Sequence, residues 1–188
     1  MSNSKGRLII LSAPSGTGKG AVIHEIRSKK PSLALSISVT TRKPRTGEVH
    51  GKDYYFVSKE RFQEMISEDE FLEYAEYVGE YYGTPKKPVM DLLEKNIDVL
   101  LELEVLGAKQ VMSIEPNALT VFIRPPNMQE LERRLTKRGT DSEDMRAERL
   151  KKAMQEMQEE QHYRYIVVND DITKTADKIL DIIKNRED

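Results

Sequence analysis

Short apolar runs alternate with longer stretches of helical periodicity along most of this chain. Residues 127–137 and 173–184 repeat apolar residues at helical spacing, so that Ala176, Ile179 and Ile183 share one helix face. Strands alternating with helices predict an α/β fold with a mostly parallel sheet and helices on both of its faces. Four runs are apolar at nearly every position, as strands buried on both faces are: residues 8–11, 99–103, 119–123 and 165–168.

Two segments interrupt this rhythm. Residues 36–84 combine alternating β-type stretches with several tyrosines, which predicts a small inserted subdomain. Residues 138–144 are polar and rich in turn formers, which predicts a flap. The helix expected after this flap places four apolar residues inward: Ala147, Leu150, Met154 and Met157.

Composition narrows the function classes. A chain of 188 residues predicts one compact domain, and the absence of cysteine excludes thiolate zinc sites, iron–sulfur clusters and thiol catalysis. With 30 Lys+Arg against 32 Asp+Glu, the net charge of −2 gives no bulk attraction to nucleic acid or to an anionic membrane. No apolar run reaches the length of a membrane span or forms a secretory core, so we expect a cytoplasmic protein.

A phosphate-binding loop follows the first expected strand and opens a helix that carries Val22, Ile23 and Ile26. Its glycines allow a turn whose N–H groups face an anion, and its lysine adds a point charge. The alternative is an ordinary glycine-rich turn between a strand and a helix. The loop consists of eight residues: Ala13, Pro14, Ser15, Gly16, Thr17, Gly18, Lys19 and Gly20.

Gly20 departs from the usual pattern of this loop. Ser or Thr normally supplies a hydroxyl to Mg²⁺ at this position, and Gly20 has none. The sequence therefore predicts a weakened hold on Mg²⁺ at the loop.

A second basic element places Arg42 and Arg45 around Pro44. Two forked guanidiniums suit a phosphate monoester, whereas a solvated basic loop is the alternative when the element is considered alone. The phosphate loop in the same chain favours a second phosphate site.

At this point the sequence closely resembles guanylate kinase. Family landmarks occur in the family's order over nearly the whole chain, at residues 15–19, 40–45, 51–54, 71–75, 81–84, 137–140 and 168–171. The resemblance implies a single domain at 5–184. Its nucleotide-binding core would comprise residues 5–37, 85–135 and 150–184, with a mixed α/β GMP-binding insertion at 38–84 and a small helical lid at 136–149.

The resemblance implies contacts to GMP from the insertion. Its guanine contacts would be Ser38, Glu73 and Thr84, and its phosphate contacts Arg42, Arg45, Tyr54 and Tyr82. Guanine offers N1–H and N2–H₂ as adjacent donors, so a single carboxylate can accept from both, whereas adenine presents an acceptor at N1.

The resemblance also implies roles at the end of the third strand and around the lid. Glu104 would approach GMP, Glu102 would reach Mg²⁺ through water, and Asn169 would lie near the adenine. Glu102 and Glu104 stand where the family often has aspartate, and Leu106 where it commonly has Gln. The implied catalytic residues are Lys19, Arg42 and the three arginines in or beside the lid, Arg134, Arg138 and Arg149.

We interpret the chain as an enzyme that uses ATP and Mg²⁺ to phosphorylate GMP, and also dGMP, to the corresponding nucleoside diphosphate. Its alternative is a catalytically weak guanylate-kinase-like module that binds phosphorylated ligands. Lys19, the loop glycines and the lid arginines favour the enzyme, because a binding module needs none of them.

Overall fold

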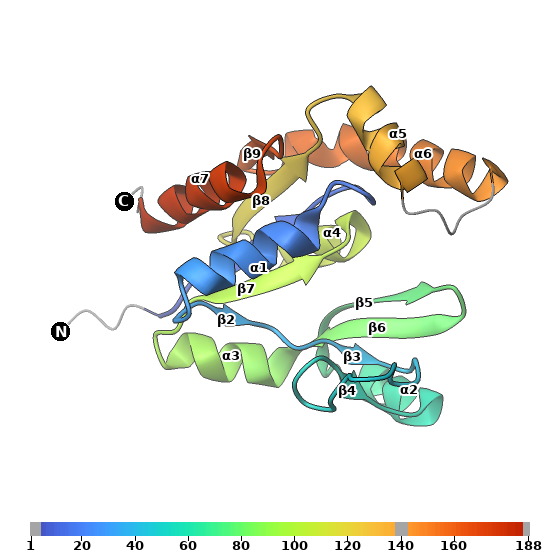
Figure 1. The fold of residues 1–188 in the computed structure, drawn as a ribbon. Helices are drawn as coiled ribbons and strands as arrows, with labels where there is room; N and C mark the ends of the chain where they lie inside the picture. The colour runs from blue at the N-terminus through green and yellow to red at the C-terminus, as the bar shows by residue number, and fades with distance from the viewer. Residues whose placement is uncertain (1–4, 138–142, 186–188) are drawn as a thin grey trace. The chain divides into compact units, whose positions relative to one another are not determined.

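The computed structural model describes residues 5–137 and 143–185, traced in Figure 1 from the blue N-terminal end to the red C-terminal end. The strands are β1 Leu8–Ser12, β2 Ala34–Leu35, β3 Val39–Thr40, β4 Tyr55–Phe56, β5 Phe71–Tyr77, β6 Glu80–Pro85, β7 Val99–Leu103, β8 Leu119–Arg124 and β9 Tyr165–Val168. The α-helices are α1 Lys19–Lys29, α2 Lys59–Ser67, α3 Lys86–Glu94, α4 Val105–Ile114, α5 Met128–Lys137, α6 Glu143–Met157 and α7 Ile172–Lys184, and a 3₁₀ helix spans Gln158–His162.

The strands form two sheets. The larger sheet has the order β2-β7-β1-β8-β9, and its pairings of β2 with β7, β1 with β8 and β8 with β9 are parallel. The smaller sheet has the order β4-β3-β6-β5 and is mixed, because β3 pairs with β4 in parallel and with β6 antiparallel. The predicted α/β class with a mostly parallel sheet is confirmed.

The chain divides into two compact units. Unit 1 contains Leu33–Leu101, Leu106–Ala118 and the chain up to Leu8. Unit 2 contains Ile9–Ser32, Glu102–Val105 and the chain from Leu119 onward. Within the described residues, no helix is long and apolar enough to cross a bilayer.

The smaller sheet of unit 1 has its own apolar core. Val39 of β3 and Phe71 of β5 are buried together with Phe62 and Met65 of α2. The rings of Phe62 and Phe71 stack with centroids 4.5 Å apart. The side chain of Ser58 caps α2 by accepting a hydrogen bond from Arg61 N. This core lies within residues 38–84, for which a GMP-binding insertion remains the prediction.

In unit 2, α1 packs beside α7 (Figure 1). The apolar residues of α1, Val22, Ile23 and Ile26, are buried, and so are the three residues that helical periodicity placed on one face of α7: Ala176, Ile179 and Ile183. Asp171 caps α7 by accepting from Lys174 N at 2.9 Å. Helical periodicity therefore predicted the buried face of α7.

The predicted inward face of α6 is wrong at two positions. Ala147 and Met154 are exposed, and the fully buried residue of this segment is Ala153, which packs with Leu131 and Leu135 of α5. The inward face also carries Arg149 and Glu156, which bind the loop after β1. The apolar pattern misplaced Ala147 and Met154 because part of the inward face is charged, whereas Leu150 packs against the buried cluster as expected.

Candidate active site

The loop after β1 adopts the backbone conformation of a phosphate loop. Gly16 and Gly18 have φ of 86° and 93°, in the left-handed region that favours glycine. A Cβ at Gly16 would lie 2.6 Å from Leu135 Cδ2, so packing as well as conformation requires glycine there. Gly18 directly precedes the first residue of α1, Lys19, and the loop therefore ends at a helix N-terminus.

Two side chains clamp the centre of this loop. The carbonyl oxygen of Thr17 accepts hydrogen bonds from Arg134 Nη1 at 2.9 Å and from Asn169 Nδ2 at 2.8 Å. Arg134 Nη2 donates to Asn169 O at 3.1 Å, and its Nε donates to Glu130 Oε1 at 2.7 Å. Asn169 is 1% exposed. Two predicted ATP-site residues, Arg134 and Asn169, thus meet on the loop backbone.

Helix α6 holds the start of the loop at Ser15. Arg149 Nη2 donates to Ser15 Oγ at 3.0 Å, and Ser15 N–H donates to Glu156 Oε2 at 3.3 Å. Burial raises the pKa of the Glu156 carboxyl. Sequence reasoning missed Glu156, although its spacing of seven from Arg149 places both on one helix face.

Lys19 reaches the carboxyl end of β7. Its Nζ donates to Leu103 O at 2.7 Å and lies 3.9 Å from Glu102 Oε1. Glu104 instead pairs with Lys152 at 3.2 Å. A Cβ at Gly20 would lie 4.0 Å from Glu102 Oε1, so this carboxylate faces the position that normally carries a metal-binding hydroxyl.

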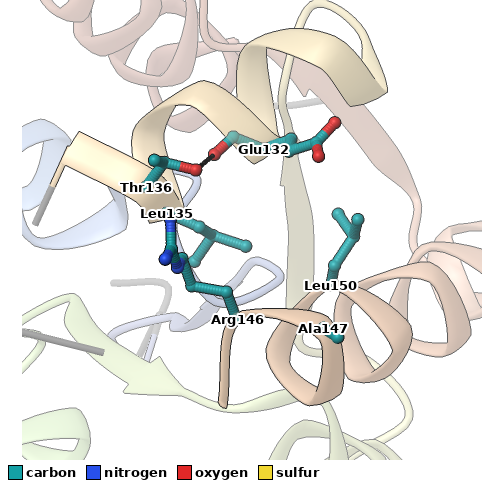
Figure 2. A pocket seen from close by; sticks show the side chains of 6 residues that line it. All are labelled: Glu132, Leu135, Thr136, Arg146, Ala147 and Leu150. Carbon is teal, nitrogen blue, oxygen red and sulfur yellow. Dashed lines mark hydrogen bonds between the residues drawn. The ribbon is translucent and has the colours of Figure 1, made fainter. Parts of the chain in front are cut away.

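A cavity of about 290 Å³ opens between α5 and α6 (Figure 2). Leu135, which lines this cavity, also packs against Gly16 of the phosphate loop. The cavity is lined by Glu132, Leu135, Thr136, Arg146, Ala147 and Leu150. Arg138 and the centre of the predicted lid lie outside the described residues.

In unit 1, a fixed arginine stands among aromatic rings. Arg42 binds Glu48 in bidentate fashion, Nη1 to Oε2 at 3.0 Å and Nη2 to Oε1 at 2.9 Å. Its guanidinium carbon lies 5.4 Å from the ring centroid of Tyr54, and that ring meets Tyr82 edge-on at 6.2 Å. Arg45 is exposed on the same loop and donates its N–H to Glu48 Oε2 at 2.7 Å.

Charge pairing stabilises this arrangement. The Arg42 guanidinium lowers the pKa of Glu48, and Glu48 in turn raises the pKa of Arg42. The structure therefore brings together Arg42, Tyr54 and Tyr82, with Arg45 on the adjoining turn. Sequence reasoning missed Glu48, because an irregular loop has no periodicity to mark the partner of an arginine.

A second polar pair is buried in the same unit. Glu73 of β5 stands opposite Thr84 of β6 in the sheet register, and Thr84 Oγ1 donates to Glu73 Oε1 at 2.6 Å. The two residues are 8% and 1% exposed. Ser38 is half-buried at the start of β3, where its carbonyl accepts from Tyr55 N at 2.9 Å. A buried carboxylate beside a hydroxyl suits a ligand that offers hydrogen-bond donors.

Comparison with known proteins identifies the family. A family model described as guanylate kinase matches residues 5–186. A guanylate kinase of Synechocystis sp. is 48% identical, covering 97% of this chain and 96% of the relative, and that of Lactobacillus johnsonii is 49% identical, covering 96% and 89%. The crystal structure of guanylate kinase from Anaplasma phagocytophilum superposes with a TM-score of 0.78 at 36% identity, covering 96% of this chain and 86% of that one. These matches confirm the resemblance on which the sequence interpretation rested, and this chain belongs to the guanylate kinase family.

Proposed function

We propose that this chain transfers the γ-phosphoryl group of ATP to GMP, and also to dGMP, in a reversible reaction that forms ADP and the guanine nucleoside diphosphate. The observation that carries the proposal is the buried Glu73–Thr84 pair in a chain that also has a phosphate loop. Glu73 can accept from guanine N1–H and N2–H₂, and adenine offers no such pair of donors.

The donor nucleotide is assigned to the loop at residues 13–20. The N–H groups of the loop and the N-terminus of α1 attract the phosphates, and Lys19 adds a full charge. Arg134 and Asn169 hold the loop through Thr17 O, while Arg149 is held at Ser15. Arg134, Arg138 and Arg149 are proposed to neutralise charge on the transferring group, and Asn169 to lie near the adenine.

The acceptor phosphate is assigned to Arg42, Arg45, Tyr54 and Tyr82. A guanidinium has five N–H donors, and the bonds of Arg42 to Glu48 and to Lys43 O use three of them. Glu48 therefore orients the Arg42 guanidinium without using all of its N–H donors. Ser38 and Glu104 are proposed as further GMP contacts.

A Mg²⁺ ion that arrives with ATP fits the residues present. Mg²⁺ takes one or two carboxylates beside phosphates and waters, and Glu102 faces the position of residue 20, where a hydroxyl would normally stand. Within the described part of the chain, no cluster of three His, Cys, Asp or Glu residues forms a metal cage. Glu102 would hold the ion through water, and the ion would neutralise phosphate charge.

Phosphoryl transfer asks the protein chiefly for positioning and charge stabilisation. The fixed forks of Arg42 and Arg134 and the clamped loop provide both without a covalent intermediate. Because water competes as an acceptor, binding GMP in line with the γ-phosphate decides between a kinase and a hydrolase. A cytoplasmic location remains the expectation from the sequence.

The test is ADP release, measured by a coupled assay with GMP, dGMP, AMP or no acceptor. We expect turnover with GMP and dGMP and little with AMP or without acceptor. Glu73→Gln should lower kcat/KM for GMP about tenfold to a hundredfold, because an amide donor then faces a guanine donor. Glu76→Gln, an exposed change in the same strand β5, is the matched control. Equal rates with GMP and AMP would contradict the proposal.

A further inference from the structure

The Glu73 carboxylate lies against the backbone of Gly107, where any Cβ would force the carboxylate to move. A Cβ built on Gly107 would lie 2.5 Å from Glu73 Oε2 and 3.1 Å from Glu73 Cδ. Ordinary contacts begin near 3.4 Å, so any side chain here would displace the carboxylate by about 1 Å. The displacement is costly because Glu73 is 8% exposed and bound to Thr84 Oγ1 at 2.6 Å.

Backbone conformation does not explain this glycine. Gly107 is the third residue of α4 and is not among the glycines with positive φ. Glycine within a helix is less favourable than alanine, because it loses more backbone freedom on folding. The room that Gly107 leaves for the Glu73 carboxylate offsets this cost.

The position of Gly107 in its helix also matters for charge. The first four N–H groups of an α-helix have no acceptor within the helix, and together they carry a partial positive charge. Glu73 Oε2 therefore lies beside the amino-terminal turn of α4, where a carboxylate is stabilised. A buried carboxylate needs such compensation to stay ionised.

We propose that Gly107 is a specificity-determining position that seats the Glu73 carboxylate between Thr84 and the first turn of α4. In this seat the carboxylate faces the ligand as an ionised acceptor for the two adjacent donors of guanine. Gly107 itself touches no substrate in this account and acts by positioning Glu73. The inference rests on the proposed function and names the contact, between Gly107 and Glu73, that makes the enzyme selective for guanine.

The test compares Gly107→Ala with the parent chain. A misplacement of about 1 Å can cost on the order of a hundredfold in efficiency. We expect kcat/KM for GMP to fall about tenfold to a hundredfold, mainly through KM, while KM for ATP stays unchanged. The preference for GMP over IMP, which lacks the 2-amino donor, should shrink. Ser113→Ala, an exposed change in the same helix, should leave all these values unchanged.

Shortening Glu73 supplies a rescue that a general folding defect would not show. In Gly107→Ala/Glu73→Asp, the carboxylate retreats by one methylene and no longer meets the new methyl group. The double variant should lose less GMP efficiency than the product of the two single losses. Multiplicative losses, or full GMP efficiency in Gly107→Ala, would overturn the inference.

The parent chain separates this inference from the proposed function. Turnover of GMP by the parent together with an unaffected Gly107→Ala variant would overturn only the role of Gly107. If the parent shows no GMP turnover, the proposed function fails. Calorimetric titration with GMP then tests separately whether Gly107 is needed for GMP binding. Undiminished GMP affinity in Gly107→Ala, or no GMP binding by the parent, would overturn the inference as well.

Discussion

Loss of Arg134 should impair the use of ATP, the phosphoryl donor, more selectively than any other change considered. Replacing it with methionine removes the donors to Thr17 O and Asn169 O while preserving much of the apolar stem. Thr17 O loses the donor from Arg134 but keeps its hydrogen bond from Asn169 Nδ2. The Arg134→Met substitution therefore loosens the phosphate loop without leaving a large cavity in the core.

The structure sets the size of the effect. A hydrogen bond to a charged group contributes about 1.5–3 kcal/mol, and Arg134→Met removes two such bonds to carbonyl oxygens. The 24% exposure of the Arg134 side chain lets water replace part of that loss. A net loss of about 1.5–3 kcal/mol corresponds to about a tenfold to hundredfold fall in kcat/KM for ATP. KM for GMP should stay close to that of the parent.

Two further variants separate geometry from charge. Arg133 binds the same carboxylate of Glu130 from the exposed side of α5, so Arg133→Met is the matched control and should retain full ATP efficiency. Arg134→Lys keeps the charge but cannot span two carbonyls and a carboxylate, so it should lose nearly as much as Arg134→Met. The assay is initial velocity against ATP at saturating GMP. Wild-type efficiency in Arg134→Met would refute the clamp, and full rescue by lysine would reduce Arg134 to a point charge.

Three other changes test the acceptor side, the metal and the pH dependence. Arg42→Lys should weaken GMP binding about tenfold or more in calorimetric titrations while ATP affinity is retained, because lysine cannot reproduce the fork fixed by Glu48; unchanged GMP affinity would remove Arg42 from the acceptor site. Gly20→Ser should move half-saturation by free Mg²⁺ to a lower concentration in ADP-release curves, since its Cβ fits 4.0 Å from the Glu102 carboxylate, whereas identical curves would show that residue 20 is no metal ligand. Arg133 and Arg134 lower the pKa of Glu130 to about 2 from its ordinary 4.5, so the pairing stabilises the fold above pH 4.5 and is lost as the pH falls toward 2. Denaturant unfolding between pH 2 and 7 should show a shallower acid loss for Glu130→Gln than for the parent, and parallel profiles would contradict the pairing.

Apolar patterning predicted the elements that are buried on both faces. The run at 8–11 lies within β1, which is buried at every position, because a strand covered on both sides has no polar positions to obscure it. The run at 165–168 coincides with β9, but burial on both faces is wrong there, since Ile166 and Val168 of this edge strand are exposed. Alternation alone did not assign β2 and β3 to different sheets. β2 joins the larger sheet and β3 the smaller one, a choice that only long-range pairing makes.

The candidate site was predictable where the chemistry is local. The phosphate loop is contiguous, and its glycines show the positive φ that the motif demands. Partners distant in sequence left no such mark. Gly107 approaches Glu73 across 34 positions, and the bond from Arg134 to Thr17 crosses 117, so that neither contact follows from spacing.

The proposed function requires that the γ-phosphoryl group of ATP is transferred to GMP and not to water. The measurement is chromatographic quantitation of ADP, GDP and inorganic phosphate after the chain is incubated with ATP, Mg²⁺ and GMP. We expect ADP and GDP in equal amounts, with no phosphate release that depends on GMP. Inorganic phosphate in place of GDP would contradict the proposed function by making the chain an ATPase, and the absence of all three products would contradict it in favour of the catalytically weak binding module.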